Sequence, residues 1–473
     1  MNNEISSWSL VEAADAIAKK EISSEELIKY SLDSIDKWNS SINAFLNIEY
    51  EEALSLAKAA DKKMESRSYT PGLLHGVPLA HKDLFYRKGK VLTCGSKVFN
   101  EFIPNFDSTI LSRLHSEEGA INVGTLNMAE IAVGASGRNE HFGHCRNPWD
   151  TKRMTGGSSS GSGAAVAARN IFGSLGTDTG GSVRIPSSAC GLVGIKGTYG
   201  RVSRHGVMPL SYTLDNAGPM TRTVRDCARM FKIIAGKDIN DPLTCNEPVP
   251  DYESLLDEFN IKGKKIGIPS SYFYENVEDS VWIQLQASLD LFKQMGAEIV
   301  NVDVPDQLIL RDMTNLILKS EVANIHKDWI INTPEKYQKE VLSRIESGLF
   351  IPATDYIRAM RLRSKHLKEF VDLVFDKCDV LHTPSLPIEP PTLEEIDLAV
   401  QDNALSINEK LPWCTRPLNY LGLPGISIPC GFSTNNMPVG FQLIGRPFSE
   451  SLLFQFGHFY QKETDWHNKF PLL

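Results

Sequence analysis

A segment of glycine and serine, residues 155–163, constrains this chain more than any other part of its sequence. It reads Thr-Gly-Gly-Ser-Ser-Ser-Gly-Ser-Gly, and Ser182 follows a glycine pair in a second such segment, 176–184. Twelve of the chain's 34 glycines lie between Gly156 and Gly200. This density indicates backbone with positive φ or in very close contact with other groups. Hydroxyls beside clustered backbone N–H donors suggest acyl transfer, in which a serine attacks a carbonyl and the N–H groups stabilise an oxyanion.

Predicted strands and helices alternate along the chain, which indicates an α/β fold. Short apolar segments predict strands within 76–85, 120–124, 171–177, 264–269, 297–302, 426–428 and 439–443. Lys82 interrupts the first of these segments, and its residue type alone favours a solvated lysine there. No internal repeat or clear linker is visible, so we predict one compact domain.

Residues 7–65 predict helices that pack on this core. Two start signals, at Ser9 and Ser23, are each followed by a glutamate three residues later, as in a capping box. A third helix carries Ser-x-x-Lys from Ser55, the spacing of penicillin-binding enzymes, but the partner motifs are missing, so we interpret it as a solvated helix face. Residues 164–168 predict a helix of small residues that begins directly behind the serine run.

The composition argues against several classes of function. A net charge of −9 and a pI near 5.7 argue against unaided nucleic-acid binding, which depends on Lys and Arg neutralising phosphates. The chain starts without a basic, apolar signal and has no run of about 18 apolar residues, so we expect a cytoplasmic protein that does not enter a membrane. Its eight scattered cysteines are expected to be reduced thiols. His141-x-x-His144-Cys145 lacks a second ligand pair, so no metal and no cofactor is expected.

Two other interpretations of the serines and glycines are weaker. Gly-x-Ser-x-Gly around Ser159 matches the nucleophile elbow of hydrolases, with His382 or His458 as the base, but an elbow follows a strand and residues 150–155 predict a polar loop. Residues 161–163 precede a helix as in a dinucleotide-binding loop, but the third glycine of that fingerprint is absent. A purely structural loop is the remaining alternative.

Several sequence blocks together resemble the amidase signature family. They are Gly-x-Pro-x-x-x-Lys-Asp at 76–83, then 156–162, 176–184 with Pro186 and Gly191, 196–203, 215–222, 419–431 and 438–445. They bracket most of the chain and leave about 225–410 as the divergent part. The resemblance implies a large twisted mixed β-sheet covered by helices on both faces. It makes 1–65 an N-terminal helical segment packed on the core and 66–473 the amidase signature domain.

The resemblance also implies a Ser-Ser-Lys triad for amide hydrolysis. Ser182 would attack the amide carbonyl, Ser158 would relay its proton, and Lys82 would be the base. The family holds the relay serine through a cis peptide, here between Gly157 and Ser158. Because an ammonium group cannot accept a proton, Lys82 must be neutral, and burial in an apolar segment promotes this.

Further roles follow from the same resemblance. The backbone N–H groups expected to form the oxyanion hole are those of Thr179, Gly180, Gly181 and Ser182. Asp178 and Arg184 are expected to support the loop of the nucleophile. Ser159 and Ser160 are expected to supply supporting hydrogen bonds.

The substrate is less constrained than the chemistry. One relation within the family is the ammonia-releasing component of the tRNA-dependent amidotransferase, its glutaminase, which residues 199–204 resemble. The acidic residue that this glutaminase carries for the amino group of glutamine aligns with Pro412 here. Arg363 is a candidate for the family's substrate-carboxylate arginine, and Trp413 and Cys414 are candidates for the pocket wall. We therefore prefer a stand-alone amidohydrolase of a small or aryl amide, and the amidotransferase glutaminase is the alternative.

An alternative that is not an enzyme is a subunit that serves only the assembly of a complex. The presence of all three triad residues argues against it, because a scaffold does not need them. The expected partner is a small-molecule amide, with direct nucleic-acid contact expected only within an amidotransferase complex. The sequence leaves open whether the protein forms a homo-oligomer.

Overall fold

One large mixed β-sheet organises the fold. The computed structural model describes residues 5–401 and 405–472, and its main sheet has eleven strands in the order β1-β3-β2-β6-β8-β7-β12-β13-β11-β9-β10. The strands of this sheet are β1 (Phe45–Ile48), β2 (Pro78–Lys82), β3 (Ile121–Leu126), β6 (Gly173–Asp178), β7 (Val193–Lys196), β8 (Asn216–Thr221), β9 (Lys265–Pro269), β10 (Glu298–Val302), β11 (Val380–Pro384), β12 (Gly425–Phe432) and β13 (Pro438–Ile444). A separate hairpin joins β4 (Arg146–Asn147) to β5 (Asp150–Met154).

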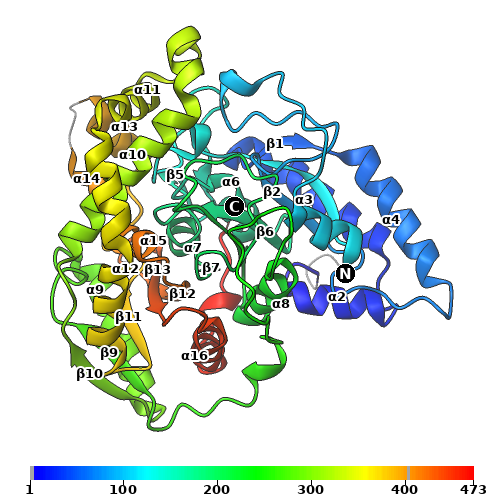
Figure 1. Cartoon of the computed structure of the whole chain (residues 1–473). Helices are drawn as coiled ribbons and strands as arrows, with labels where there is room; N and C mark the ends of the chain where they lie inside the picture. The colour runs from blue at the N-terminus through cyan, green and yellow to red at the C-terminus, as the bar shows by residue number, and fades with distance from the viewer. Residues whose placement is uncertain (1–4, 402–404, 473) are drawn as a thin grey trace.

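Helices surround the sheet, with α2 to α4 at one end of the molecule and α10 and α12 at the other (Figure 1). The α-helices are α2 (Leu10–Ala18), α3 (Ser24–Ile42), α4 (Tyr50–Met64), α5 (Thr109–Leu111), α6 (Ser160–Ala167), α7 (Arg184–Cys190), α8 (Val224–Ile234), α9 (Asp279–Gln294), α10 (Gln307–Asn332), α11 (Lys339–Glu346), α12 (Ala353–Phe375), α13 (Leu393–Gln401), α14 (Leu405–Lys410), α15 (Arg416–Leu421) and α16 (Glu450–Lys462). Short helical turns are η1 (Lys97–Phe99), η2 (Ser112–Glu117), η3 (Glu130–Ala132), η4 (Ser254–Leu256), η5 (Pro334–Lys336), η6 (Ser347–Phe350) and η7 (Trp466–Asn468). Within the described ranges, no helix combines the length and the apolar character needed to cross a bilayer.

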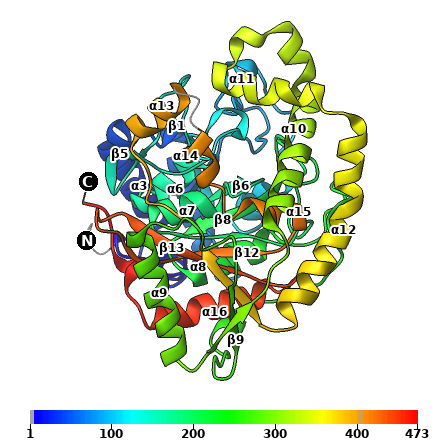
Figure 2. The same ribbon diagram turned by 90° about the vertical axis from the view of Figure 1, so that its left-hand side faces the viewer.

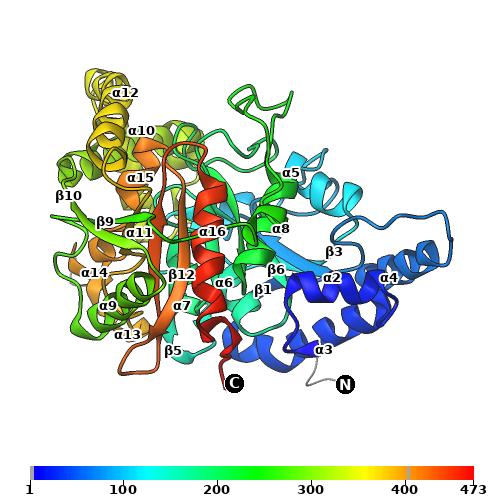
Figure 3. The same ribbon diagram turned by 90° about the horizontal axis from the view of Figure 1, so that it is seen from below.

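Both faces of the sheet are covered by apolar layers, as the resemblance implied. On one face, Phe292 of α9 contacts Phe441 of β13 and Phe456 of α16 with ring centroids 5.7 and 6.3 Å apart. Helices α2 and α8 belong to the same apolar cluster, and Figure 3 shows α16 running along this face. On the other face, Ala164 and Ala165 of α6 share a cluster with residues of α3, α4 and β3. Burial of this apolar surface from both sides is the main favourable term for the fold.

The N-terminal segment is less uniform than predicted. Both predicted capping boxes are present, because Ser9 and Ser23 each exchange hydrogen bonds with the glutamate three residues later. However, 1–65 is not helical throughout, since β1 pairs antiparallel with β3 at the edge of the main sheet. Lys58 on α4 is exposed and pairs with Glu25, as expected of a solvated helix face. The division of the chain at residue 65 stays a prediction.

Two parallel neighbours in the sheet, β2 and β6, bring two of the glycine-rich blocks together. Leu79 is opposite Gly173 and His81 is opposite Leu175. Strand β2 ends at Lys82 and β6 ends at Asp178. Because carboxyl ends of parallel strands open at the same edge, this register places Lys82 beside the loop that carries Ser182.

Candidate active site

Lys82 and Ser158 are in direct contact at this edge of the sheet. The Lys82 amine lies 2.7 Å from Ser158 Oγ and 2.8 Å from Thr177 Oγ1, and both hydroxyls accept hydrogen bonds from it. Lys82 is 1% exposed and Ser158 is fully buried. The peptide between Gly157 and Ser158 is cis, as the resemblance implied. The structure therefore brings together two of the three predicted catalytic residues, 76 positions apart in the sequence.

Burial changes the acid–base properties of this lysine. It lowers the pKa of Lys82 to about 7, against the opposing effects of the Asp215 and Asp178 carboxylates. Desolvation disfavours the ammonium form because, among the described residues, two neutral hydroxyls are its hydrogen-bond partners and no carboxylate forms an ion pair with it. A large fraction of Lys82 is therefore neutral at neutral pH and able to accept a proton from Ser158.

We expect kcat/KM for amide hydrolysis to rise with pH through a midpoint near 7, because a Lys82 base is active above its pKa and inactive below it. The measurement is a pH–rate profile on one amide between pH 5 and 9. Lys196 is the control, since burial lowers its pKa to about 7 as well, but its amine donates to the Gly197 carbonyl and not to the serines. Lys196→Met should keep the midpoint, and a flat wild-type profile would contradict the assignment.

The loop that carries Ser182 is held by Asp178 and Arg184. The Asp178 carboxylate accepts the backbone N–H of Gly181 at 2.8 Å and the Arg184 guanidinium at 2.9 and 3.0 Å. Both side chains are fully buried. Burial alone would raise the pKa of Asp178, but the ion pair with Arg184 holds it well below its usual value. These contacts support the predicted role of both residues in shaping the loop.

The loop leaves fewer oxyanion donors than predicted. The N–H of Gly181 is used by Asp178, so it is not available to a substrate. Among the described residues, no acceptor lies within hydrogen-bonding distance of the Gly180 and Ser182 N–H groups. Thr179 donates its hydroxyl to Asp215 at 2.5 Å. The backbone N–H groups of Thr179, Gly180 and Ser182 therefore remain candidates for oxyanion donors, whereas the N–H of Gly181 is already bonded to Asp178.

Gly181 has a different function, which is to permit a tight turn. Its φ is 130°, a conformation that favours glycine. A Cβ at this position would lie 2.2 Å from Thr415 Oγ1. That hydroxyl donates to the Gly180 carbonyl at 2.7 Å, so Thr415 fixes the same turn from the opposite side.

Three supporting residues were missed by the sequence reasoning. Asn419 donates to Asp178 at 2.9 Å and accepts from Arg184 at 2.7 Å, while Gln442 accepts from Arg184 at 2.6 Å. Thr177 is the third, as the second acceptor of Lys82. Asn419 and Gln442 lie in the two C-terminal blocks that carried the family resemblance, which is the signal that would have found them.

The remaining serines of the run have structural contacts. Ser159 Oγ exchanges hydrogen bonds with the backbone of Thr177, and Ser160 Oγ donates to the Asn127 carbonyl. Helix α6 begins at Ser160, within the serine run and not behind it at 164 as predicted. Residues 150–154 form β5 and not a loop, but this strand pairs with β4 alone, outside the main sheet.

The elbow interpretation of Ser159 receives no support from the two candidate histidines. His382 lies with Tyr274 and Ser288, at 2.6 and 3.0 Å. His458 lies 3.5 Å from Asp257. Neither histidine is a hydrogen-bond partner of Ser159 in the described part of the chain.

The two predicted substrate contacts are used elsewhere. Arg363 donates to the backbone carbonyls of Thr213, Asn419 and Tyr420, so all three of its nitrogens are engaged. Trp413 stacks on Tyr272 with ring centroids 4.5 Å apart. This geometry argues against both as substrate-binding residues, since neither borders the cavity at Ser182.

A cavity of about 290 Å³ opens beside the half-exposed Ser182. Its wall includes Thr179 and Gly180 of the nucleophile loop, together with parts of η3, α10, α11 and α14. Apolar side chains such as Ile185 and Val322 cover much of it. The space suits a small substrate whose carbonyl reaches Ser182.

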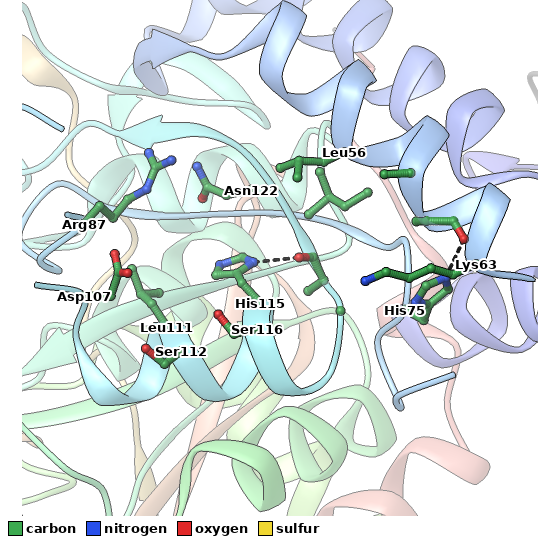
Figure 4. A pocket seen from close by; sticks show the side chains of 15 residues that line it. Leu56, Lys63, His75, Arg87, Asp107, Leu111, Ser112, His115, Ser116 and Asn122 are labelled. Atoms are coloured by element: carbon green, nitrogen blue, oxygen red, sulfur yellow. Dashed lines mark hydrogen bonds between the residues drawn. The ribbon is translucent and has the colours of Figure 1, made fainter. Parts of the chain in front are cut away.

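Figure 4 shows a different cavity, of about 310 Å³, between α4 and residues 107–122. None of the predicted catalytic residues borders it. His115 Nδ1 lies 2.9 Å from the Ala120 carbonyl and His75 Nε2 lies 3.2 Å from the Ala60 carbonyl, the two dashed contacts of the figure. These imidazoles are held by the backbone, and we assign this cavity no part in the chemistry.

Known proteins resemble this chain along most of its length. The family model described as Amidase matches residues 26–454. The glutamyl-tRNA(Gln) amidotransferase A subunit of Dechloromonas aromatica (strain RCB) is 36% identical over 487 residues, which cover 98% of this chain and 98% of that protein. The crystal structure of the protein of the same name from Thermotoga maritima has a TM-score of 0.83 at 32% identity, over 99% of this chain and 98% of that chain.

A further solved structure is described as a vestigial protein complex that reveals the evolutionary origins of an s-triazine catabolic enzyme. It has a TM-score of 0.89 and 30% identity, over 96% of this chain and 98% of that chain. The likeness in fold therefore extends over nearly the whole chain.

Proposed function

This chain belongs to the amidase signature family and is an amidohydrolase of linear amide C–N bonds, and we propose that it acts through an acyl-enzyme on Ser182. Neutral Lys82 accepts the proton of Ser158, and Ser158 accepts the proton of Ser182. The Ser182 oxygen then bonds to the amide carbon, and backbone N–H groups among those of Thr179, Gly180 and Ser182 hold the oxyanion. The hydrogen bond of 2.7 Å from Lys82 to Ser158 is the observation that carries this proposal.

The second half of the reaction reverses the relay. Ser158 gives its proton to the leaving nitrogen as the C–N bond breaks, which leaves an ester on Ser182. Water then attacks this ester, its proton passes along the same relay, and the carboxylic acid leaves. The hydrogen bonds of the described residues do not include one between Ser158 and Ser182. Such catalytic contacts often tighten only when the substrate binds.

For the substrate, we propose glutamine, with the chain serving as the ammonia-releasing glutaminase of a tRNA-dependent amidotransferase. The relatives named for this function match along 98% of the chain, which supports this reading over the stand-alone hydrolase preferred from sequence. A stand-alone hydrolase is the second candidate. The observation that favours it is Pro412, which borders the cavity where an acidic residue was expected for the amino group of glutamine.

Partner dependence separates the two candidates. We expect the chain alone to hydrolyse glutamine slowly, and partner subunits with charged tRNA to raise the rate by roughly one to two orders of magnitude. The measurement is ammonia release in the presence and absence of partners, with Ser182→Ala as the blank. Rapid hydrolysis of small amides by the chain alone, with no response to partners, would favour the stand-alone enzyme.

A further inference from the structure

The cavity beside Ser182 has an excess of positive charge. Lys319, Arg344 and Arg416 border it, against one carboxylate, Glu409. Arg344 is paired with Glu340 on the same helix. The rest of the wall is neutral. A cavity with this balance attracts an anionic group more than a neutral or cationic one.

Arg416 is a partly buried cation of this wall whose charge has no partner among the described residues. Its Nε is buried and has no hydrogen-bond partner among the described residues. Within the same residues, no carboxylate lies within 4.0 Å of its guanidinium. The other arginines near the loop differ, since Arg184 pairs with Asp178 and Arg363 is held by three carbonyls. A half-buried guanidinium without a partner is costly, which points to a ligand that supplies one.

The position of Arg416 places that ligand close to the reacting carbonyl. Arg416 begins α15, which packs against α10 (Figure 2). A Cβ added to Gly180 would lie 3.6 Å from Arg416 Nε. The preceding residue, Thr415, donates to the Gly180 carbonyl at 2.7 Å. The arginine is therefore anchored to the nucleophile loop, beside a proposed oxyanion donor.

Neighbouring charges make an anion at this place favourable. Burial, followed by Arg344 and Arg311, lowers the pKa of Arg416 to about 10. The guanidinium stays protonated at neutral pH and carries an uncompensated desolvation cost. A carboxylate with two parallel hydrogen bonds to the guanidinium would offset that cost.

We propose that Arg416 binds a carboxylate on the acyl part of the substrate, a few carbons from the scissile amide. The proposal rests on the amidase chemistry proposed for Ser182 and names the substrate class of that site. The substrate is then the monoamide of a short dicarboxylic acid, of which glutamine is an amino-substituted example. Arg416 replaces Arg363 as the arginine for this carboxylate.

The test separates binding from turnover. In the full-length Ser182→Ala chain, glutaramate, which is glutamine without its amino group, is compared with butyramide, which has no carboxylate, by calorimetry. We expect Arg416→Gln to weaken glutaramate binding by about 10- to 100-fold, the loss of a charged hydrogen bond, and to leave butyramide binding unchanged. Arg416→Lys should retain part of the affinity, and Arg361→Gln, on the exposed face of α12, should retain all of it.

Two results would overturn the proposal. One is equal binding of glutaramate and butyramide to the Arg416-containing chain. The other is an equal loss for both amides in Arg416→Gln, which would mean that Arg416 only maintains the loop. Failure of the amidase assignment gives a different result: the Ser182-containing chain, with partner subunits present, would hydrolyse no amide, while the binding comparison would still decide the role of Arg416.

Discussion

Replacing Ser182 by alanine is expected to lower kcat/KM for amide hydrolysis on the order of 10⁴- to 10⁶-fold, as the loss of a nucleophile does in other serine hydrolases. The substitution removes the atom that bonds to the substrate. Ser182 is half-exposed and its Oγ takes part in no hydrogen bond recorded within the described residues, so the fold should remain intact. The measurement is steady-state hydrolysis together with a thermal melt.

Chemical labelling provides an independent test of the same serine. An activated fluorophosphonate should label Ser182, and Ser182→Ala should not be labelled. Ser159→Ala is the matched control from the serine run, because Ser159 contacts only the Thr177 backbone. An adduct that maps to Ser159 would instead support the hydrolase elbow. Full activity of Ser182→Ala would show that another residue is the nucleophile.

Replacing Lys82 by methionine is expected to lower kcat/KM by roughly 10²- to 10⁴-fold, the usual contribution of a general base. Methionine retains the length and apolar stem of lysine in a fully buried site, so packing is preserved. The variant also removes a buried amine whose charged form is disfavoured. The fold should therefore survive while the Ser158–Ser182 relay loses its proton acceptor.

The control for Lys82→Met is Thr177→Val, which removes the other hydroxyl bound to the lysine amine at 2.8 Å. Because Thr177 transfers no proton in the proposed mechanism, this variant should lose at most about tenfold, the value of one hydrogen bond. Full activity of Lys82→Met would contradict the assignment of Lys82 as the base of the triad. A loss in Thr177→Val as large as in Lys82→Met would show that the lysine site is only structural.

Local sequence patterns predicted helices and strands well where the spacing of apolar residues and the helix-capping residues indicated the same element. The helix starts at Ser9 and Ser23 and the strands on either side of α9 follow directly from such patterns. Strand β5 was missed because its polar residues form a surface hairpin that no apolar period marks. Strand β1 was missed because it is only four residues long and lies between two helices with strong sequence signals.

Some features of the candidate site could likewise be predicted from the sequence, and others could not. The positions of Lys82, Ser158 and Ser182 followed from the family resemblance, and the cis peptide before Ser158 came with it. The donor set of the oxyanion hole did not, because the use of the Gly181 N–H by Asp178 is a matter of geometry and not of residue type. The choice between Arg363 and Arg416 is of the same kind, since only the structure shows which guanidinium is already occupied.

The supports of the nucleophile loop come from two distant parts of the chain. Arg184 is held by Asn419 and Gln442, which follow it in the chain by 235 and 258 residues. A growing chain on the ribosome that has not yet reached these residues leaves a buried arginine without its partners. The loop can take its final form only after the C-terminal hairpin of β12 and β13 has joined the sheet. Hydrolytic activity should therefore appear only after β13 has been synthesised and has joined the sheet.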